Sequence, residues 1–201
     1  MENRKYAFGV DKYSLLDNVI FYLRKRQVVK RIPTTAKIIA DCGAGYDCRL
    51  LISLLNDTVI TKAIAIDTEF KSELASVPNL TLTIANLNQP IPLADSSIDG
   101  ALSLAVLEHL DSPEVFLKEL YRIVRPGGVV LLTTPGPTSK PLLEFLAFRL
   151  GIIDKQEIAD HKQYFSSEML QAAFEEAGFT PSLVTPRRFL FGMNNIVMAI
   201  R

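Results

Sequence analysis

Two acids and a pair of glycines near the ends of the first two apolar runs are the residues best placed to do chemistry. Asp41 precedes the turn Gly43, Ala44 and Gly45 in "KIIADCGAGYD", and Asp67 ends the next run in "KAIAID". Glycines let a backbone bend sharply and let a ligand approach where a Cβ would collide. A carboxylate at a strand end can accept both hydroxyls of a ribose. Together these residues indicate a nucleoside site, although Asp67 alone is equally well explained as a helix-capping surface acid.

The charge around the glycine turn discriminates between two kinds of nucleotide ligand. The dinucleotide fingerprint G-x-G-x-x-G wants a third glycine where this chain has Cys48, and it places a pyrophosphate on the helix N-terminus. Asp41 before the turn and Asp47 after it are poorly placed for a pyrophosphate. They suit a ligand that carries an ammonium and a sulfonium. A nicotinamide-dependent oxidoreductase remains as the alternative.

Strands that alternate with helices must position these residues. Near-continuous apolar runs begin at residues 37, 62, 80, 99 and 128, and such runs suit strands buried on both faces. Helical patterns separate them, the clearest being "SPEVFLKELYRIV". We therefore predict an α/β fold with a doubly wound, mostly parallel sheet, whose ligands bind beyond the carboxyl ends of the strands.

The two ends of the chain depart from this alternation. "SLVTPRRFLF" and "NNIVMAIR" are separated by little more than "GM", which is too short for a crossover helix, so we predict an antiparallel hairpin as the last two of seven strands. At the other end, residues 1–34 are predicted to form a helical extension with "DNVIFYLRKRQVV" as its body. Residues 35–201 would form the single catalytic or binding domain.

Composition excludes several classes of protein. The chain has 22 basic and 22 acidic residues in 201, so no overall charge favours nucleic acid, and none is expected as a partner. No apolar run has the length of a signal-peptide core at the N-terminus or of a transmembrane segment elsewhere, so we expect a cytoplasmic protein. Cys42 and Cys48 are the only cysteines. Their spacing matches neither a disulfide framework nor a metal site, so no metal is expected.

Four motifs in sequence order connect the chain with a known family. "IIADCGAGYD" is similar to hhD-x-G-x-G-x-G with Asp47 in place of the last glycine, and "AIAIDTEF" resembles the second motif. "ANLNQPIPLADSSIDGALSLAVLEHL" resembles the stretch that ends in LEHL, and "LYRIVRPGGVVLLTTP" resembles the LKPGG motif. From about residue 36 onward the chain resembles the class I S-adenosylmethionine-dependent methyltransferases of small molecules, which include the quinone-biosynthesis methyltransferases. The resemblance implies a Rossmann-like methyltransferase fold with S-adenosyl-L-methionine as cofactor.

The resemblance also implies which residues bind the cofactor. The methionine portion would be contacted by Asp41, Gly43 and Gly45, the ribose by Asp67, and the adenine by Asn86 and Leu87. Leu104 and Ala105 would line the methionine end and the route to the methyl group. Ala44 and Thr68 complete the expected cofactor-binding set. The family commonly has an acid at the position of Asn86, so this chain would address the adenine without charge assistance. Asp47 is the larger departure. It is explained either by tolerable backbone geometry, since aspartate accepts a positive φ and a helix N-terminus favours an acid, or by a degraded, non-catalytic site.

Methyl transfer from a sulfonium asks for little acid or base chemistry, because the leaving thioether needs no proton and alignment supplies most of the catalysis. A base matters only when the acceptor must lose a proton. His109 and His161 are the only histidines, and each is either such a base or a structural residue. Tyr164 is a further candidate for the acceptor pocket.

The stretch 138–165 is longer than a bare connection, and its "LLEFLAFRL" is apolar nearly all round. It forms a lid over an apolar acceptor, an interface in a homodimer, or a helix packed on the core. The sequence and the resemblance thus predict methyl transfer to a small-molecule acceptor, with an apolar one such as a quinone, a lipid precursor or a secondary metabolite as the candidates. The alternatives are the nicotinamide-dependent oxidoreductase and a non-catalytic S-adenosylmethionine-binding protein.

Overall fold

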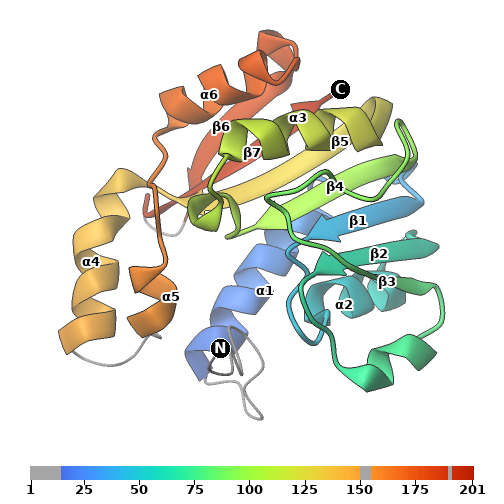
Figure 1. Ribbon diagram of the computed structural model, residues 1–201, viewed down its shortest axis with the longest axis horizontal. Coiled ribbons are helices and arrows are strands. Elements are labelled where there is room, and N and C mark those ends of the chain that lie inside the picture. Colours follow the sequence, from blue (N-terminus) through green and yellow to red (C-terminus); the bar gives the residue numbers. More distant parts are fainter. Residues whose placement is uncertain (1–14, 150–154, 190–191) are drawn as a thin grey trace.

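A single seven-stranded sheet forms the centre of the molecule. The computed structural model describes residues 15–149, 155–189 and 192–201. The strands lie in the order β3-β2-β1-β4-β5-β7-β6 (Figure 1). Their bounds are β1 Ile38–Cys42, β2 Lys62–Asp67, β3 Leu80–Ile84, β4 Ile98–Leu104, β5 Val124–Pro135, β6 Val184–Phe189 and β7 Asn194–Ile200. β1 to β5 pair in parallel, whereas β7 runs antiparallel to both β5 and β6. The predicted doubly wound sheet with its C-terminal hairpin is confirmed.

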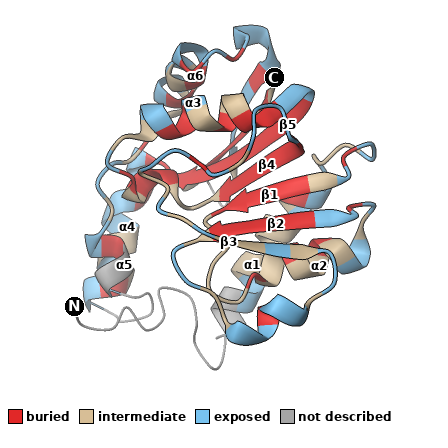
Figure 2. Cartoon of the chain, turned by 45° about the vertical axis from the view of Figure 1, so that its right-hand side comes forward, coloured by how far each residue is buried: buried red, intermediate tan, exposed pale blue. Residues whose placement is uncertain are grey.

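Helices cover both faces of this sheet. The α-helices are α1 Leu15–Val29, α2 Arg49–Asp57, α3 Pro113–Ile123, α4 Lys140–Glu144, α5 Lys155–Ala159 and α6 Ser167–Glu176. Short turns of helix are η1 Ser72–Ser76, η2 Leu107–His109, η3 Pro137–Ser139, η4 Phe145–Arg149 and η5 Pro181–Leu183. One apolar core joins the sheet to α3 and α6 and the other joins it to α1 and α2. Buried residues concentrate along β1, β4 and β5 (Figure 2).

The predicted N-terminal helical body lies within α1. Val28 of this helix is fully buried in the same core as Leu51 and Leu54 of α2, so α1 packs directly on the sheet domain. Residues 1–14 of the predicted extension lie outside the described part of the chain. Within the described ranges, no helix is long and apolar enough to cross a bilayer.

The strand order reverses between β1 and β4, and Asp99 fixes the register there. Its carboxylate accepts the backbone N–H groups of Lys37 at 2.5 Å and Ile38 at 2.9 Å, and it pairs with Arg125 at 3.0 Å. A buried carboxylate with these partners holds the starts of β1 and β4 together. The carboxyl ends of the two strands consequently reach the same edge of the sheet, where ligands of such folds bind.

The substitution Asp99→Asn tests this anchor. An amide oxygen accepts more weakly than a carboxylate and leaves Arg125 without its buried partner, so we expect the free energy of unfolding to fall by about 1–3 kcal/mol. Chemical denaturation measures it. The matched control is Asp95→Asn, since Asp95 pairs with Arg122 but its side chain is 76% exposed. The control substitution should lower the free energy of unfolding by no more than about 1 kcal/mol. Equal decreases in the two variants would contradict the anchoring role of Asp99.

Candidate functional site

The turn after β1 is folded back onto the end of β2. The N–H groups of Gly43 and Ala44 both donate to the carbonyl of Ile66, at 2.8 and 3.3 Å. The N–H of Gly45 donates to Oδ2 of Asp67 at 2.9 Å. Three successive amides of the turn are thus satisfied by the neighbouring strand, and they do not form an open cradle for phosphate oxygens.

The two glycines of the turn are needed for different reasons. Both have positive φ, +92° at Gly43 and +75° at Gly45. A Cβ on Gly43 would lie 2.3 Å from Cγ2 of Val106, whereas a Cβ on Gly45 would meet no protein atom within 4 Å. Gly43 therefore lets the segment after β4 pack against the turn, and Gly45 leaves open space beside it.

The acid that replaces the last glycine of the motif does not have positive φ. The left-handed residue is its neighbour Cys48, with φ 50°, which begins α2. Oδ1 of Asp47 accepts the N–H of Arg49 at 3.3 Å, and the N–H of Cys48 donates to the carbonyl of Gly45 at 3.3 Å. The positive φ considered for Asp47 is therefore wrong, whereas the other expected feature, an acid at a helix N-terminus, is present. The acid interacts with the N-terminus of α2, where negative charge is favoured.

Asp41 and Asp67 lie close enough to influence each other. Asp41 is 3% exposed, and its Oδ1 accepts no hydrogen bond from the residues that the structure describes. Burial, and secondly the charge of Asp67, raise the pKa of Asp41 to about 7. Asp67 is half-buried, and its Oδ1 also accepts the N–H of Thr68 at 2.7 Å. A buried carboxylate oxygen with no partner beside the open space at Gly45 suits a cationic group of a ligand.

The residues predicted for the adenine and the methyl route follow the next two strand ends. Asn86 is exposed, and its Oδ1 accepts the N–H of Asn88 at 3.0 Å, so this carbonyl already has one partner. Leu87 is half-buried against the core. At the end of β4, Leu104 is half-buried and Ala105 has φ 60°. All these residues follow the carboxyl ends of β3 and β4, at the same edge of the sheet as the glycine turn (Figure 1).

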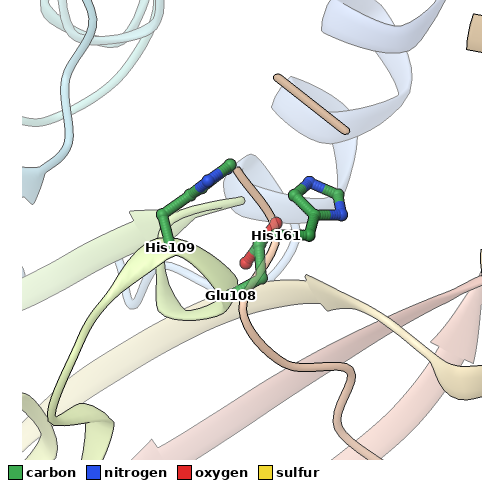
Figure 3. Close-up of side chains that lie close together, drawn as sticks. All are labelled: Glu108, His109 and His161. Atoms are coloured by element: carbon green, nitrogen blue, oxygen red, sulfur yellow. The ribbon is translucent and has the colours of Figure 1, made fainter. Parts of the chain in front are cut away.

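The two histidines, proposed separately from the sequence, lie together in the structure. The rings of His109 and His161 are 4.8 Å apart and meet edge to face (Figure 3). Nδ1 of His161 lies 3.1 Å from the hydroxyl of Tyr164. Burial, and secondly the charge of His109, lower the pKa of His161 to about 4. Glu108, which is 1% exposed, completes the cluster. The sequence reasoning did not include Glu108, although its place directly before His109 was the available signal.

The segment 138–165 presents apolar side chains to the exterior. Leu142 of α4 and Phe145 and Phe148 of η4 are 41%, 51% and 49% exposed, whereas Ala147 is buried. α4 and α5 lie side by side at one end of the sheet (Figure 1). The exposed side chains favour a lid or an interface over a helix packed wholly on the core. Residues 150–154 lie outside the described ranges.

Comparison with known proteins places the chain in a family. A family model described as a methyltransferase domain matches residues 24–183, and the chain belongs to this family. The resemblance inferred from the four motifs is confirmed.

Individual relatives agree with this assignment. A probable S-adenosylmethionine-dependent methyltransferase of Mycolicibacterium smegmatis is 34% identical over 100 residues, which are 48% of this chain and 36% of the relative. A ubiquinone biosynthesis O-methyltransferase of Maricaulis maris is 29% identical over 114 residues, 56% of this chain and 42% of the relative. The chain thus spans less than half the length of either relative. The crystal structure of a SAM-dependent methyltransferase from Archaeoglobus fulgidus has the same fold, with a TM-score of 0.68, 16% identity, and coverage of 92% of this chain and 94% of that one.

The different roles of the two glycines predict different costs of substitution. Gly43→Ala adds a collision with Val106 to the strain of a positive φ, so it should destabilise the fold by about 1–3 kcal/mol more than Gly45→Ala, which carries the φ strain alone. Thermal or chemical unfolding measures both. In the Gly43→Ala background, Val106→Ala should recover part of the loss by making room. Equal costs for the two alanines, or no recovery, would contradict the packing described.

Proposed function

We propose that this chain transfers the methyl group of S-adenosylmethionine to a small-molecule acceptor. The observation that carries the proposal is the buried Asp41 oxygen without a partner, next to a glycine turn whose own amides are already satisfied. Such a site attracts a cation and offers little to an anion. S-adenosylmethionine carries an ammonium and a sulfonium, and when bound it supplies an activated methyl group.

Each predicted binding residue has a role that its environment supports. Asp41 would hold the ammonium of the methionine portion. Asp67 would accept the ribose hydroxyls, since a carboxylate has about four acceptor positions. The N–H groups of Gly45 and Thr68 occupy two of them, and the Thr68 hydroxyl, which lies 3.3 Å from Oδ1, would give up a third to the ligand. Asn86 and Leu87 would contact the adenine.

The same observations count against a nicotinamide cofactor. A dinucleotide pyrophosphate needs free N–H groups at the turn and at the helix N-terminus. Here the N–H groups of Gly43, Ala44 and Gly45 donate to the end of β2, and that of Arg49 donates to Asp47. The carboxylate of Asp47 would repel the pyrophosphate in addition.

The acceptor would bind beyond Leu104 and Ala105, between the end of β4 and the segment 138–165. Phe145 and Phe148 are exposed on that segment, which fits an apolar acceptor or closure by a second copy of the chain. His109 and His161 are the candidates for removing a proton from the acceptor. The Maricaulis maris relative is described as a ubiquinone biosynthesis O-methyltransferase, and an apolar acceptor that carries a phenolic hydroxyl, as a reduced quinone does, suits this chemistry.

The ribose assignment predicts a specific pattern of ligand affinities. The unsubstituted protein should bind S-adenosylhomocysteine about 10–100-fold more tightly than an analogue that lacks both ribose hydroxyls, because a hydrogen bond to a charged group contributes about 1.5–3 kcal/mol. Asp67→Ala should bind both ligands with similar affinity, which separates the ribose contact from any loosening of the turn. Calorimetry measures all four constants. Tight binding of NADH with no response to S-adenosylhomocysteine would overturn the proposed function.

The raised pKa of Asp41 predicts a dependence on pH. In the free protein this carboxyl is protonated at higher pH than in the unfolded chain, so its contribution to stability should be lost as pH rises from about 4 through about 7. Affinity for S-adenosylhomocysteine should instead increase over the upper part of this range, because the ammonium needs the ionised acid. Asp41→Asn should flatten both profiles, as measured by thermal unfolding and calorimetry. Unchanged profiles in that variant would show that another group titrates.

A further inference from the structure

A cluster of three side chains beside the proposed methyl route has the composition of a metal site. One ligand atom from each of Glu108, His109 and His161 lies within 4.8 Å of the other two (Figure 3). Glu108 is 1% exposed and the two histidines are half-buried. The Glu108 carboxylate is thus removed from water and lies beside two imidazoles, which distinguishes this cluster from the exposed acids that are common on protein surfaces.

The protein holds these residues together from two distant parts of the chain. Glu108 and His109 belong to η2, after β4, whereas His161 follows α5. The N–H of Lys162 donates to the carbonyl of Glu108 at 2.8 Å, and the side chains of Lys162 and Asp111 form an ion pair. These two links bring the loops into fixed contact next to the cluster.

A hydrogen bond also orients one of the rings. The Tyr164 hydroxyl lies 3.1 Å from Nδ1 of His161. Metal-bound histidines almost always have such a partner on the nitrogen that does not face the metal, and the partner holds the ring in the binding orientation. Tyr164 is thus explained as a positioning residue for His161.

We propose that Glu108, His109 and His161 bind one divalent transition-metal ion, of which Zn²⁺ is the best match. Two imidazoles and one carboxylate form a three-ligand set that leaves at least one coordination position open, as in catalytic zinc sites. Imidazole ligands favour Zn²⁺ and its neighbours over Mg²⁺ and Ca²⁺. Ligand atoms around tetrahedral Zn²⁺ are about 3.3 Å apart, so rotation of the side chains must bring the most distant pair about 1.5 Å closer. The proposal departs from the expectation of no metal, which was based on cysteine spacing.

The location of the cluster suggests what the metal does. Val106, two residues before Glu108, packs against Gly43 of the glycine turn. The ion would therefore lie beside the methionine end of the proposed cofactor site. An oxygen of the acceptor could occupy the open position, where a bound cation favours its ionised, nucleophilic form. With the metal bound, the ion would take over the activation of the acceptor from His109 and His161, because metal-bound imidazoles do not act as bases. This role rests on the proposed function, whereas metal binding itself does not.

The test uses the untagged 201-residue chain after treatment with a chelator, without cofactor. We expect calorimetry to show one Zn²⁺ per chain and at least about tenfold weaker binding of Mg²⁺. Because the chain has only two histidines, their ring resonances in NMR identify the site directly, and stoichiometric Zn²⁺ should shift both. Resonances that do not move would overturn the proposal.

Matched variants locate the carboxylate ligand. Glu108→Gln and His161→Gln should each weaken Zn²⁺ binding by about tenfold or more. Glu114→Gln removes an exposed carboxylate of the neighbouring helix α3, outside the cluster and its supporting links, and it should leave the affinity unchanged. An equal loss of Zn²⁺ affinity in the control and in Glu108→Gln would refute the assignment of Glu108 as a ligand. If Glu108→Gln does not fold, the Zn²⁺ affinity of His161→Gln and the NMR titration of the unsubstituted protein still test the metal site.

A parallel titration with S-adenosylhomocysteine separates this proposal from the proposed function. The cluster variants should retain cofactor affinity within about threefold, because none of the three residues is assigned to the nucleoside. Zn²⁺ binding without any binding of S-adenosylhomocysteine would support the metal site and contradict the methyltransferase activity. Binding of S-adenosylhomocysteine without binding of Zn²⁺ would support the proposed function and contradict the metal site.

Discussion

The hydrogen bonds between the glycine turn and the end of β2 are the constraint on which the rest of the site depends. Gly43 and Ala44 donate to the carbonyl of Ile66, and Gly45 donates to the carboxylate of Asp67. The side chain of Asp67 thus closes the turn, and its remaining acceptor capacity is available to a ligand. Because the turn is fixed to β2, its position follows from the sheet register, which Asp99 sets at the other end of β1.

This arrangement gives the site its charge preference. Amides that already donate cannot cradle phosphates, and a buried carboxyl with a raised pKa favours a ligand that brings a positive charge. Keeping Asp41 buried without a partner costs folding stability in the free protein. A protein that binds an ammonium there recovers this cost on binding, so stability and cofactor affinity should be linked.

Much of the fold could be predicted from the sequence, because parallel strands buried on both faces leave near-continuous apolar runs and a short connection excludes a crossover. The runs that begin at residues 37 and 62 correspond to β1 and β2, and the acids near their ends lie at one edge of the sheet. The backbone at Asp47 could not be anticipated, because the strain falls on Cys48 instead. Nor could the proximity of Glu108 and His161 be anticipated, because it depends on how the loop after α5 returns to η2, which no local pattern encodes.

The central claim is that the acids at the ends of β1 and β2 hold S-adenosylmethionine around the glycine turn. A crystal structure of the chain with S-adenosylhomocysteine tests it most directly. We predict that the ribose hydroxyls lie about 2.7–3.2 Å from the carboxylate oxygens of Asp67, and that the amino group of the ligand lies at a similar distance from the carboxylate of Asp41. A nucleoside bound at any other edge of the sheet would contradict this claim, and so would protein side chains that fill the open space beside Gly45.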